Sequence, residues 1–238
     1  IISLFGNAIL RFSLSLYVLE VTGSAAVFGT ILAVSMIPTV LLSPFGGVLA
    51  DRLPKQKIMT ILDFVTAGLI VFYDAVYGSA GNLAAVTIFM ILLTLIQAFY
   101  QPSVQASIPL LASQEQLMAA NGIVMQVQAL AGLLGPILAG MLYGIGGVKP
   151  ILAASAVCFF LSAVMELFLR IPHEKREADG SPVRMALLDL KGAVTYLIRE
   201  NTCLFKLLIV VAGINLFLSA LFIIGLPYLV KIYLGMSA

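Results

Sequence analysis

Long runs of hydrophobic residues, separated by short polar breaks, dominate the chain. From Val21 to Ala50 the sequence contains no charged side chain. A membrane-spanning helix needs about twenty apolar residues to cross roughly 30 Å of hydrocarbon, whereas a barrel strand needs about ten. Because the runs are long and none alternates polar with apolar positions, we expect an all-α membrane protein. The predicted spans are approximately 1–21, 25–50, 57–78, 82–111, 119–144, 150–170 and 203–230.

Composition supports a membrane protein and excludes several functional classes. The chain is 61% hydrophobic and 10% charged, whereas soluble domains carry about 25% charge. Its net charge of +2 gives no support for a nucleic-acid partner. His173 is the only histidine, and Cys158 lies far from Cys203, so we expect neither a metal cluster nor a disulfide framework. No phosphate-binding loop occurs, and we expect no cofactor and no enzymatic activity.

Basic residues gather on one predicted side of the membrane. Of the thirteen lysines and arginines, ten fall on the side that holds the break after the second run and the segment 171–202. Only Lys149 and Lys231 fall on the other side, and Arg11 lies within the first span. Lysine and arginine are enriched in cytoplasmic loops. We therefore expect these two breaks to be cytoplasmic in a multi-pass protein of the cell membrane.

Three regions are predicted from this pattern: a six-helix transmembrane half at 1–171, a cytoplasmic linker at 172–202 and a seventh helix at 203–238. Ser181-Pro182 resembles a helix start, and apolar residues then recur at helical spacing. This favours an amphipathic helix at the membrane interface, with a solvated loop as the alternative. A linker between a sixth and a seventh helix suggests two six-helix halves. We expect the partner to be the missing C-terminal half or a second copy. The recurring apolar residues are Leu187, Leu190, Val194 and Leu197.

Residues 47–57, Gly-Val-Leu-Ala-Asp-Arg-Leu-Pro-Lys-Gln-Lys, resemble the loop 2–3 signature of the major facilitator superfamily. Pro54 stands where that signature usually has glycine. The resemblance implies that Asp51 contacts a helix of the second half and gates alternating access, and a plain topology anchor is the alternative. The matching positions are Gly47, Asp51, Arg52, Lys55 and Lys57.

Residues 132–140 in the fifth span resemble the Gly-Pro motif of antiporters in that superfamily. Residues 19–25 and 120–122 resemble its drug:proton antiporter branch, which includes macrolide-efflux and enterobactin-export proteins. The resemblance implies proton-coupled efflux of amphiphilic small molecules. An importer of a sugar or organic ion, or a non-transporting membrane fragment, remains the alternative. The motif residues are Gly132, Gly135, Pro136 and Gly140, which would seal the cavity or simply bend and thin the helix.

A few polar residues inside the apolar runs are candidates for binding substrate or protons. Arg11 lies nine residues before Glu20, roughly 13 Å deeper at 1.5 Å per residue. A charge at that depth marks a functional site by default, and a structural ion pair is the alternative. In the family, the first and fourth helices line the cavity. Further polar candidates there are Asn7, Gln97, Gln101, Gln126 and Asn215, and inter-helix hydrogen bonds would also explain the glutamines.

The intramembrane carboxylates are the candidate proton carriers. Asp63 is a candidate that would alternatively pair with Arg52 or a lysine, and Glu20 would lie at the mouth of the cavity. We expect Asp74 to be water-exposed. We also expect Glu166 to form an ion pair at the surface with Arg170, four positions later. The fourth span lacks the arginine that many drug exporters carry midway along that helix, so coupling through such an arginine is not expected.

Overall fold

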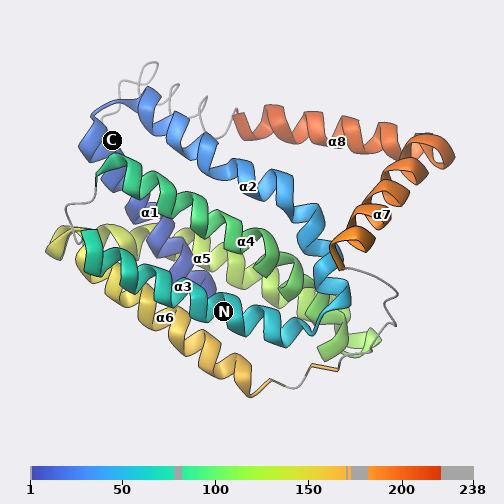
Figure 1. The fold of residues 1–238 in the computed structure, drawn as a ribbon, viewed down its shortest axis with the longest axis horizontal. Helices are drawn as coiled ribbons and strands as arrows, with labels where there is room; N and C mark the ends of the chain where they lie inside the picture. Colours follow the sequence, from blue (N-terminus) through green and yellow to red (C-terminus); the bar gives the residue numbers. More distant parts are fainter. Residues whose placement is uncertain (1, 78–81, 170, 173–181, 221–238) are drawn as a thin grey trace. The chain divides into compact units, whose positions relative to one another are not determined.

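The computed structural model describes residues 2–77, 82–169, 171–172 and 182–220. The chain divides into two compact units, Ile1–Ala186 and Leu187–Ala238, and each is described by itself. All regular secondary structure in these described ranges is helical (Figure 1). The predicted all-α fold is therefore confirmed.

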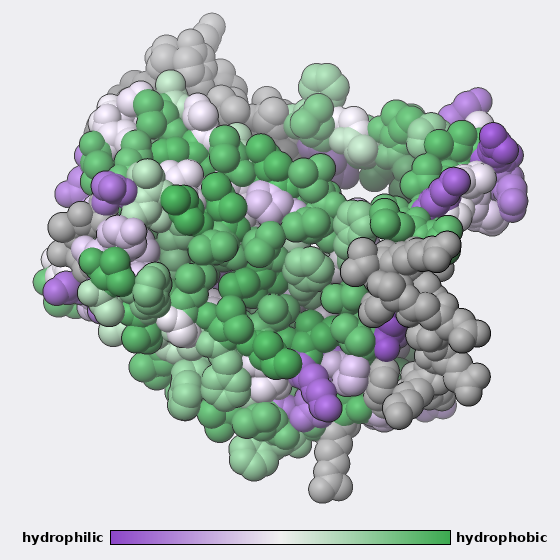
Figure 2. Space-filling view, viewed as in Figure 1, coloured by the Kyte–Doolittle hydropathy of each residue, from purple (hydrophilic) through white to green (hydrophobic). Residues whose placement is uncertain are grey.

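Six long helices form the first unit, and each is long and apolar enough to cross a membrane. Their limits agree with the first six predicted spans to within three residues. On the face drawn in Figure 2, hydrophobic side chains cover the middle of this unit, and hydrophilic ones gather toward its ends. The helices are α1 (Ile2–Thr22), α2 (Ala25–Arg52), α3 (Lys55–Tyr77), α4 (Leu83–Leu111), α5 (Leu117–Gly146) and α6 (Lys149–Leu167).

Local sequence signals explain where these helices begin and end. The side chains of Ser24 and Asn82 each accept a hydrogen bond from a backbone N–H in the first turn of α2 and α4, which is the usual role of an N-cap. Gly23 and Gly147 adopt positive φ angles of 59° and 65° between consecutive helices, where a side chain would be strained. The chain therefore reverses tightly after α1 and after α5.

The packing places α1 and α4 at the centre of the first unit. The most extensive contacts are between α2 and α4 and between α3 and α6, and α1 packs against both α5 and α6. Leu10, Leu14, Phe89 and Phe159 belong to one buried core that joins these helices. Polar residues on the inner faces of α1 and α4 are therefore enclosed by apolar side chains.

The helices after residue 181 include the second unit, and the boundary between the two units falls within α7, after Ala186. α7 spans Pro182–Thr195 and begins at the predicted proline, and a single π-helical turn follows at Tyr196–Glu200. α8 spans Thr202–Ala220, and the helical segments on either side of Asn201 meet at 102°. The last ten residues of the predicted seventh span lie outside the described residues. So do the basic residues Arg170, Lys175, Arg176 and Lys231.

Close contact between α2 and α4 requires a glycine at position 46. A Cβ atom built on Gly46 would overlap the backbone carbonyl oxygen of Ala98. A Gly46→Ala substitution should therefore push the helices apart and lower the free energy of unfolding by about 1–3 kcal/mol, the usual cost of overpacking. Thermal unfolding of the detergent-solubilised protein measures this loss.

Gly29→Ala provides a control on the same helix, because no described atom lies within 4 Å of a Cβ built there. This variant should be as stable as the wild type or slightly more stable, since alanine favours the helix over glycine. Equal losses in the two variants would contradict the close-packing explanation.

Candidate functional site

A small polar cavity lies inside the first unit between α1, α2 and α4. Its volume is about 10 Å³, which is room for about one water molecule. Asn7 and Arg11 line it from α1, and Gln97 lines it from α4. These three residues were predicted separately from the sequence, and the fold brings them together.

Arg11 has no hydrogen-bonding or charged partner for its guanidinium among the described residues. Its side chain is half-buried, and Asn7 lies one turn before it on the same helix. An arginine presents five N–H donors in a planar fork that matches carboxylates and other paired oxygen atoms. The cavity therefore offers several donors to a ligand that carries acceptor oxygens.

Hydrogen bonds between α2 and α4 fix the wall opposite Arg11. The Thr94 hydroxyl donates to the backbone carbonyl of Ser35, and the Thr39 hydroxyl donates to the carbonyl of Thr94 at 3.2 Å. Ser35 and Thr94 also line the cavity. This wall is consequently held by polar bonds as well as by the close contact at Gly46.

Other predicted cavity residues do not line this pocket. Gln101 is half-buried one turn beyond Gln97 on α4, and Gln126 is exposed on α5. Asn215 belongs to the second unit, where its side chain is exposed and donates to the backbone carbonyl of Val211 at 3.0 Å. Their roles in binding remain predictions.

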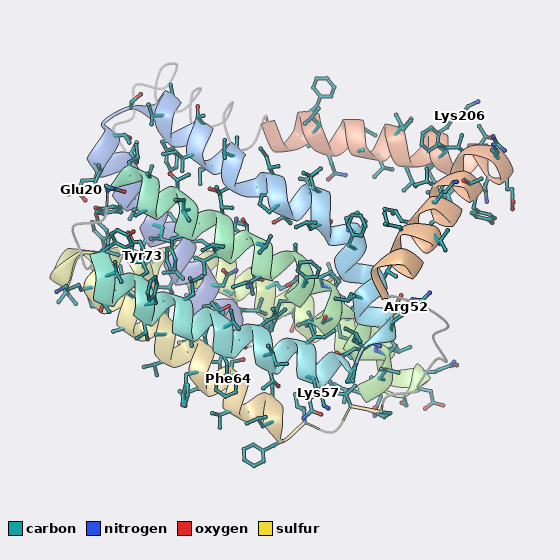
Figure 3. All side chains as sticks on the ribbon, in the orientation of Figure 1. Glu20, Arg52, Lys57, Phe64, Tyr73 and Lys206 are labelled. Carbon is teal, nitrogen blue, oxygen red and sulfur yellow. The ribbon has the colours of Figure 1, made fainter. Side chains whose placement is uncertain are left out.

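Glu20 marks the opposite end of the unit from the loop motif. Figure 3 shows Glu20 at one end of the helices and Arg52 and Lys57 at the other. The hydroxyl of Tyr143 on α5 donates to a carboxylate oxygen of Glu20. Both residues line an open crevice of about 530 Å³ between the ends of α1 and α5. Glu20 is therefore linked to α5.

The loop motif forms the junction of α2 and α3. Asp51 and Arg52 end α2, and Lys55 begins α3 after a break of only two residues. Asp51 and Lys57 are exposed, whereas Arg52 and Lys55 are half-buried. The carboxylate of Asp51 is therefore accessible to a partner surface. Gly47 has open space around it among the described residues.

Gln56 within this motif has a role that the sequence did not reveal. Its side-chain amide donates to the backbone carbonyls of Glu166 and Leu167, at 3.0 and 3.1 Å. Carbonyls in the last turn of a helix lack partners within that helix. Gln56 therefore attaches the end of α6 to the motif. No spacing rule connects residues 110 positions apart.

Only one of the motif glycines in α5 makes the predicted close contact. A Cβ built on Gly135 would lie 2.6 Å from the Cβ of Ala8, so α5 approaches α1 closely at this point. Gly132 and Gly140 have no described atom within 4 Å of such a Cβ. Pro136 lies within a helix that continues to Gly146. Among these three glycines, α5 approaches a neighbouring helix closely at Gly135 alone in the described part of the chain.

The structure changes the interpretation of two carboxylates. Glu166 is only 7% exposed and accepts a hydrogen bond from Tyr100 at 2.9 Å, so its expected position on the surface is wrong. Asp74 is half-buried, and its Oδ1 is enclosed without a hydrogen-bond partner among the described residues. Asp63, at 1% exposure, lies beside Tyr100, Ser162 and Glu166.

Six membrane-length helices around a buried polar site define a multi-pass integral membrane protein. The family model of the Major Facilitator Superfamily matches residues 1–238. The chain therefore belongs to this superfamily, and the resemblance seen in the sequence is confirmed. No solved structure matches the chain significantly.

Similar curated proteins include transporters for two kinds of compound. Macrolide efflux protein A of Streptococcus pyogenes is 28% identical over 214 residues, covering 88% of this chain and 51% of the relative. Its namesake in Enterococcus faecalis is 28% identical over 79% of this chain and 58% of the relative. The staphyloferrin A transporter of Staphylococcus aureus is 23% identical over 74% of this chain and 45% of the relative. The chain spans about half the length of the relatives it matches.

Removal of the Gln56 side chain should loosen the end of α6. Gln56→Ala leaves the carbonyls of Glu166 and Leu167 without this donor, and the expected loss is about 1 kcal/mol in the free energy of unfolding. Thermal unfolding in detergent measures it. Gln114→Ala, at an exposed glutamine, should have no effect. Equal stability of Gln56→Ala and wild type would show that these bonds contribute nothing.

Proposed function

We propose that the chain is the six-helix half, with the seventh helix, of a proton-coupled exporter of amphiphilic small molecules. The observation that carries the proposal is the meeting of Asn7, Arg11 and Gln97 around one cavity between α1 and α4. Polar groups at such depth are costly in hydrocarbon and are retained where a polar ligand passes. The similarity to macrolide and siderophore transporters supports the same class of cargo.

Arg11 favours substrates that present acceptor oxygens. Its guanidinium has no partner among the described residues, so a ligand oxygen would gain a charge-assisted hydrogen bond there. A carboxylate from elsewhere in the full-length protein is the competing partner. In that arrangement Arg11 would be neutralised in the resting state, and a cationic drug would be tolerated nearby.

The loop motif and the α5 motif supply the moving parts of this proposal. Asp51 lies exposed at the end of α2, where it would contact the N-terminus of a helix in the second half and hold one arrangement of the halves. We place this loop and the linker in the cytoplasm because basic residues are concentrated there. The contact of Gly135 with Ala8 keeps α5 against α1 and would limit leakage through the unit.

Transport would require a second set of helices facing the cavity. Arg11 and Gln97 lie on the two central helices of a single unit, and a cavity between two halves needs the opposite wall. The remaining half of the same protein is the proposed partner, and a second copy is the substitute. The lipid bilayer, the cargo and protons complete the set of partners.

The proposal is tested in everted membrane vesicles that contain the full-length protein and a preset pH gradient. Addition of a macrolide, or of a carboxylate-bearing amphiphile, should partly collapse the gradient. Arg11→Ala should weaken the response to the accepted compound by about tenfold or more, because a hydrogen bond to a charged group contributes about 1.5–3 kcal/mol. A pH-sensitive fluorescent dye measures the collapse.

Two glutamines on α4 provide a matched comparison for this experiment. Gln97 lines the cavity, whereas Gln105 is exposed two turns later. Gln97→Ala should reduce the response, and Gln105→Ala should leave it unchanged. The assignment of this cavity would be overturned if no compound collapsed the gradient with the wild-type protein. Equal gradient collapse with Arg11→Ala and wild type would also overturn it.

A further inference from the structure

A second polar cluster lies between α1, α3, α4 and α6, separate from the cavity at Arg11. The Tyr100 hydroxyl is at its centre, 2.9 Å from Glu166 Oε1, 3.5 Å from Asp63 Oδ2 and 2.9 Å from Ser3 Oγ. Ser162 of α6 lies beside the Asp63 carboxyl. All five side chains are buried. The cluster therefore joins four helices through one hydroxyl group.

The hydrogen bonds available here are too few for two ionised carboxylates. The Tyr100 hydroxyl has one proton and can donate fully to one acceptor, and its shorter contact is with Glu166. Glu166 Oε2 is buried without any partner among the described residues. Two negative charges that both lie within hydrogen-bonding distance of one hydroxyl group, and are removed from water, disfavour each other strongly. One added proton would remove a charge and also supply a donor.

We propose that Asp63 and Glu166 form a proton-binding site that holds one proton between the two carboxyl groups, next to Tyr100. The proton is taken from water as the substrate cycle begins and returned to water as it ends. Its role in transport rests on the proposed function, whereas its binding does not. This inference assigns the coupling proton to helices α3 and α6 and not to the cavity at Arg11.

This site lies at the inner end of an open crevice. The crevice, of about 550 Å³, is lined at its inner part by Tyr100, Ser162 and Glu166. Leu111 and Leu169 line it near the ends of α4 and α6, where both are exposed. The crevice thus leads from the end of the unit that carries the loop motif to a carboxyl group with an unpartnered oxygen.

Few charged groups of the described residues compete for this proton. α3 contributes Asp63, α4 contributes Tyr100, α6 contributes Glu166, and α1 contributes the neutral Ser3. Lys55 and Lys57 begin α3, about 9 Å or more from Asp63 at 1.5 Å per residue. Arg170, four positions after Glu166, lies outside the described residues, and the experiment below tests its effect.

Loss of the proton would affect the helices that line the substrate cavity. Ser3 lies one turn before Asn7 on α1, and Tyr100 lies one turn after Gln97 on α4. The bond between Ser3 and Tyr100 therefore connects α1 and α4, which line the cavity together with α2. Without a shared proton, both carboxylates compete for the Tyr100 hydroxyl, and this connection is strained. The proton site and the cavity are coupled through one turn of each helix.

Infrared difference spectroscopy of the purified full-length protein tests the site directly. Acid-minus-alkaline spectra should contain the carbonyl stretching band of a protonated carboxylic acid in a dry environment. Asp63→Asn and Glu166→Gln should each abolish this band. Glu115→Gln, the same substitution at an exposed carboxylate before α5, should leave it unchanged. Asn and Gln keep the shape and neutrality of a protonated acid, so we expect folded variants.

Each outcome decides the proposal. A band that persists in both variants, or is lost in only one of them, overturns a shared proton. Absence of the band from the wild type, as an ion pair of Glu166 with Arg170 would cause, also overturns it. If a variant does not fold, as judged by loss of its size-exclusion peak, isotope labelling of the wild-type protein takes its place. Labels on aspartate carboxyls and labels on glutamate carboxyls must then each shift the wild-type band. A wild-type band without gradient collapse in vesicles would reject antiport but retain the proton site.

Discussion

Hydrocarbon offers no hydrogen-bond partners, and this constraint shapes the first unit. Backbone groups are satisfied by uninterrupted helices, which six long apolar runs provide. Hydroxyl groups donate hydrogen bonds to backbone carbonyls of their own helix. Ser13, Ser103 and Ser107 each donate to the carbonyl four residues earlier. Once these are accounted for, few polar groups remain to be explained. Arg11, Asp63 and Glu166 stand out for that reason.

The remaining polar groups form two clusters instead of being scattered. One surrounds Arg11 between α1, α2 and α4, and the other surrounds Tyr100 between α1, α3, α4 and α6. Both require helices that approach closely, because lipid supplies no hydrophobic force to press helices together. Small residues at the contacts meet this need, with Gly46 against α4 and Gly135 against α1. The apolar packing and the polar sites are therefore interdependent.

The sequence predicted the helices well and the partners of individual side chains poorly, for a single physical reason. In a soluble protein, apolar periodicity separates the buried face of a helix from its exposed face. In a membrane both faces are apolar, so the pattern around Glu166 does not tell whether it faces lipid or α4. Its spacing to Arg170 suggested a surface pair, whereas the packing of α3 against α6 buries it. Asn7, Arg11 and Gln97 were found because a polar residue in an apolar run is itself the signal.

The separation of the two clusters bears on how an exporter would prevent protons from crossing without transport of cargo. If a proton and a cargo bind the same group, they exclude each other directly. Here the carboxyl groups and Arg11 are on different sides of the central helices, and what connects them is the bond between Ser3 and Tyr100. In the proposed exporter, coupling would then depend on the packing of α1 against α4 rather than on competition for a site. Such an exporter would accept chemically varied cargo, since the cargo and the proton would bind different groups.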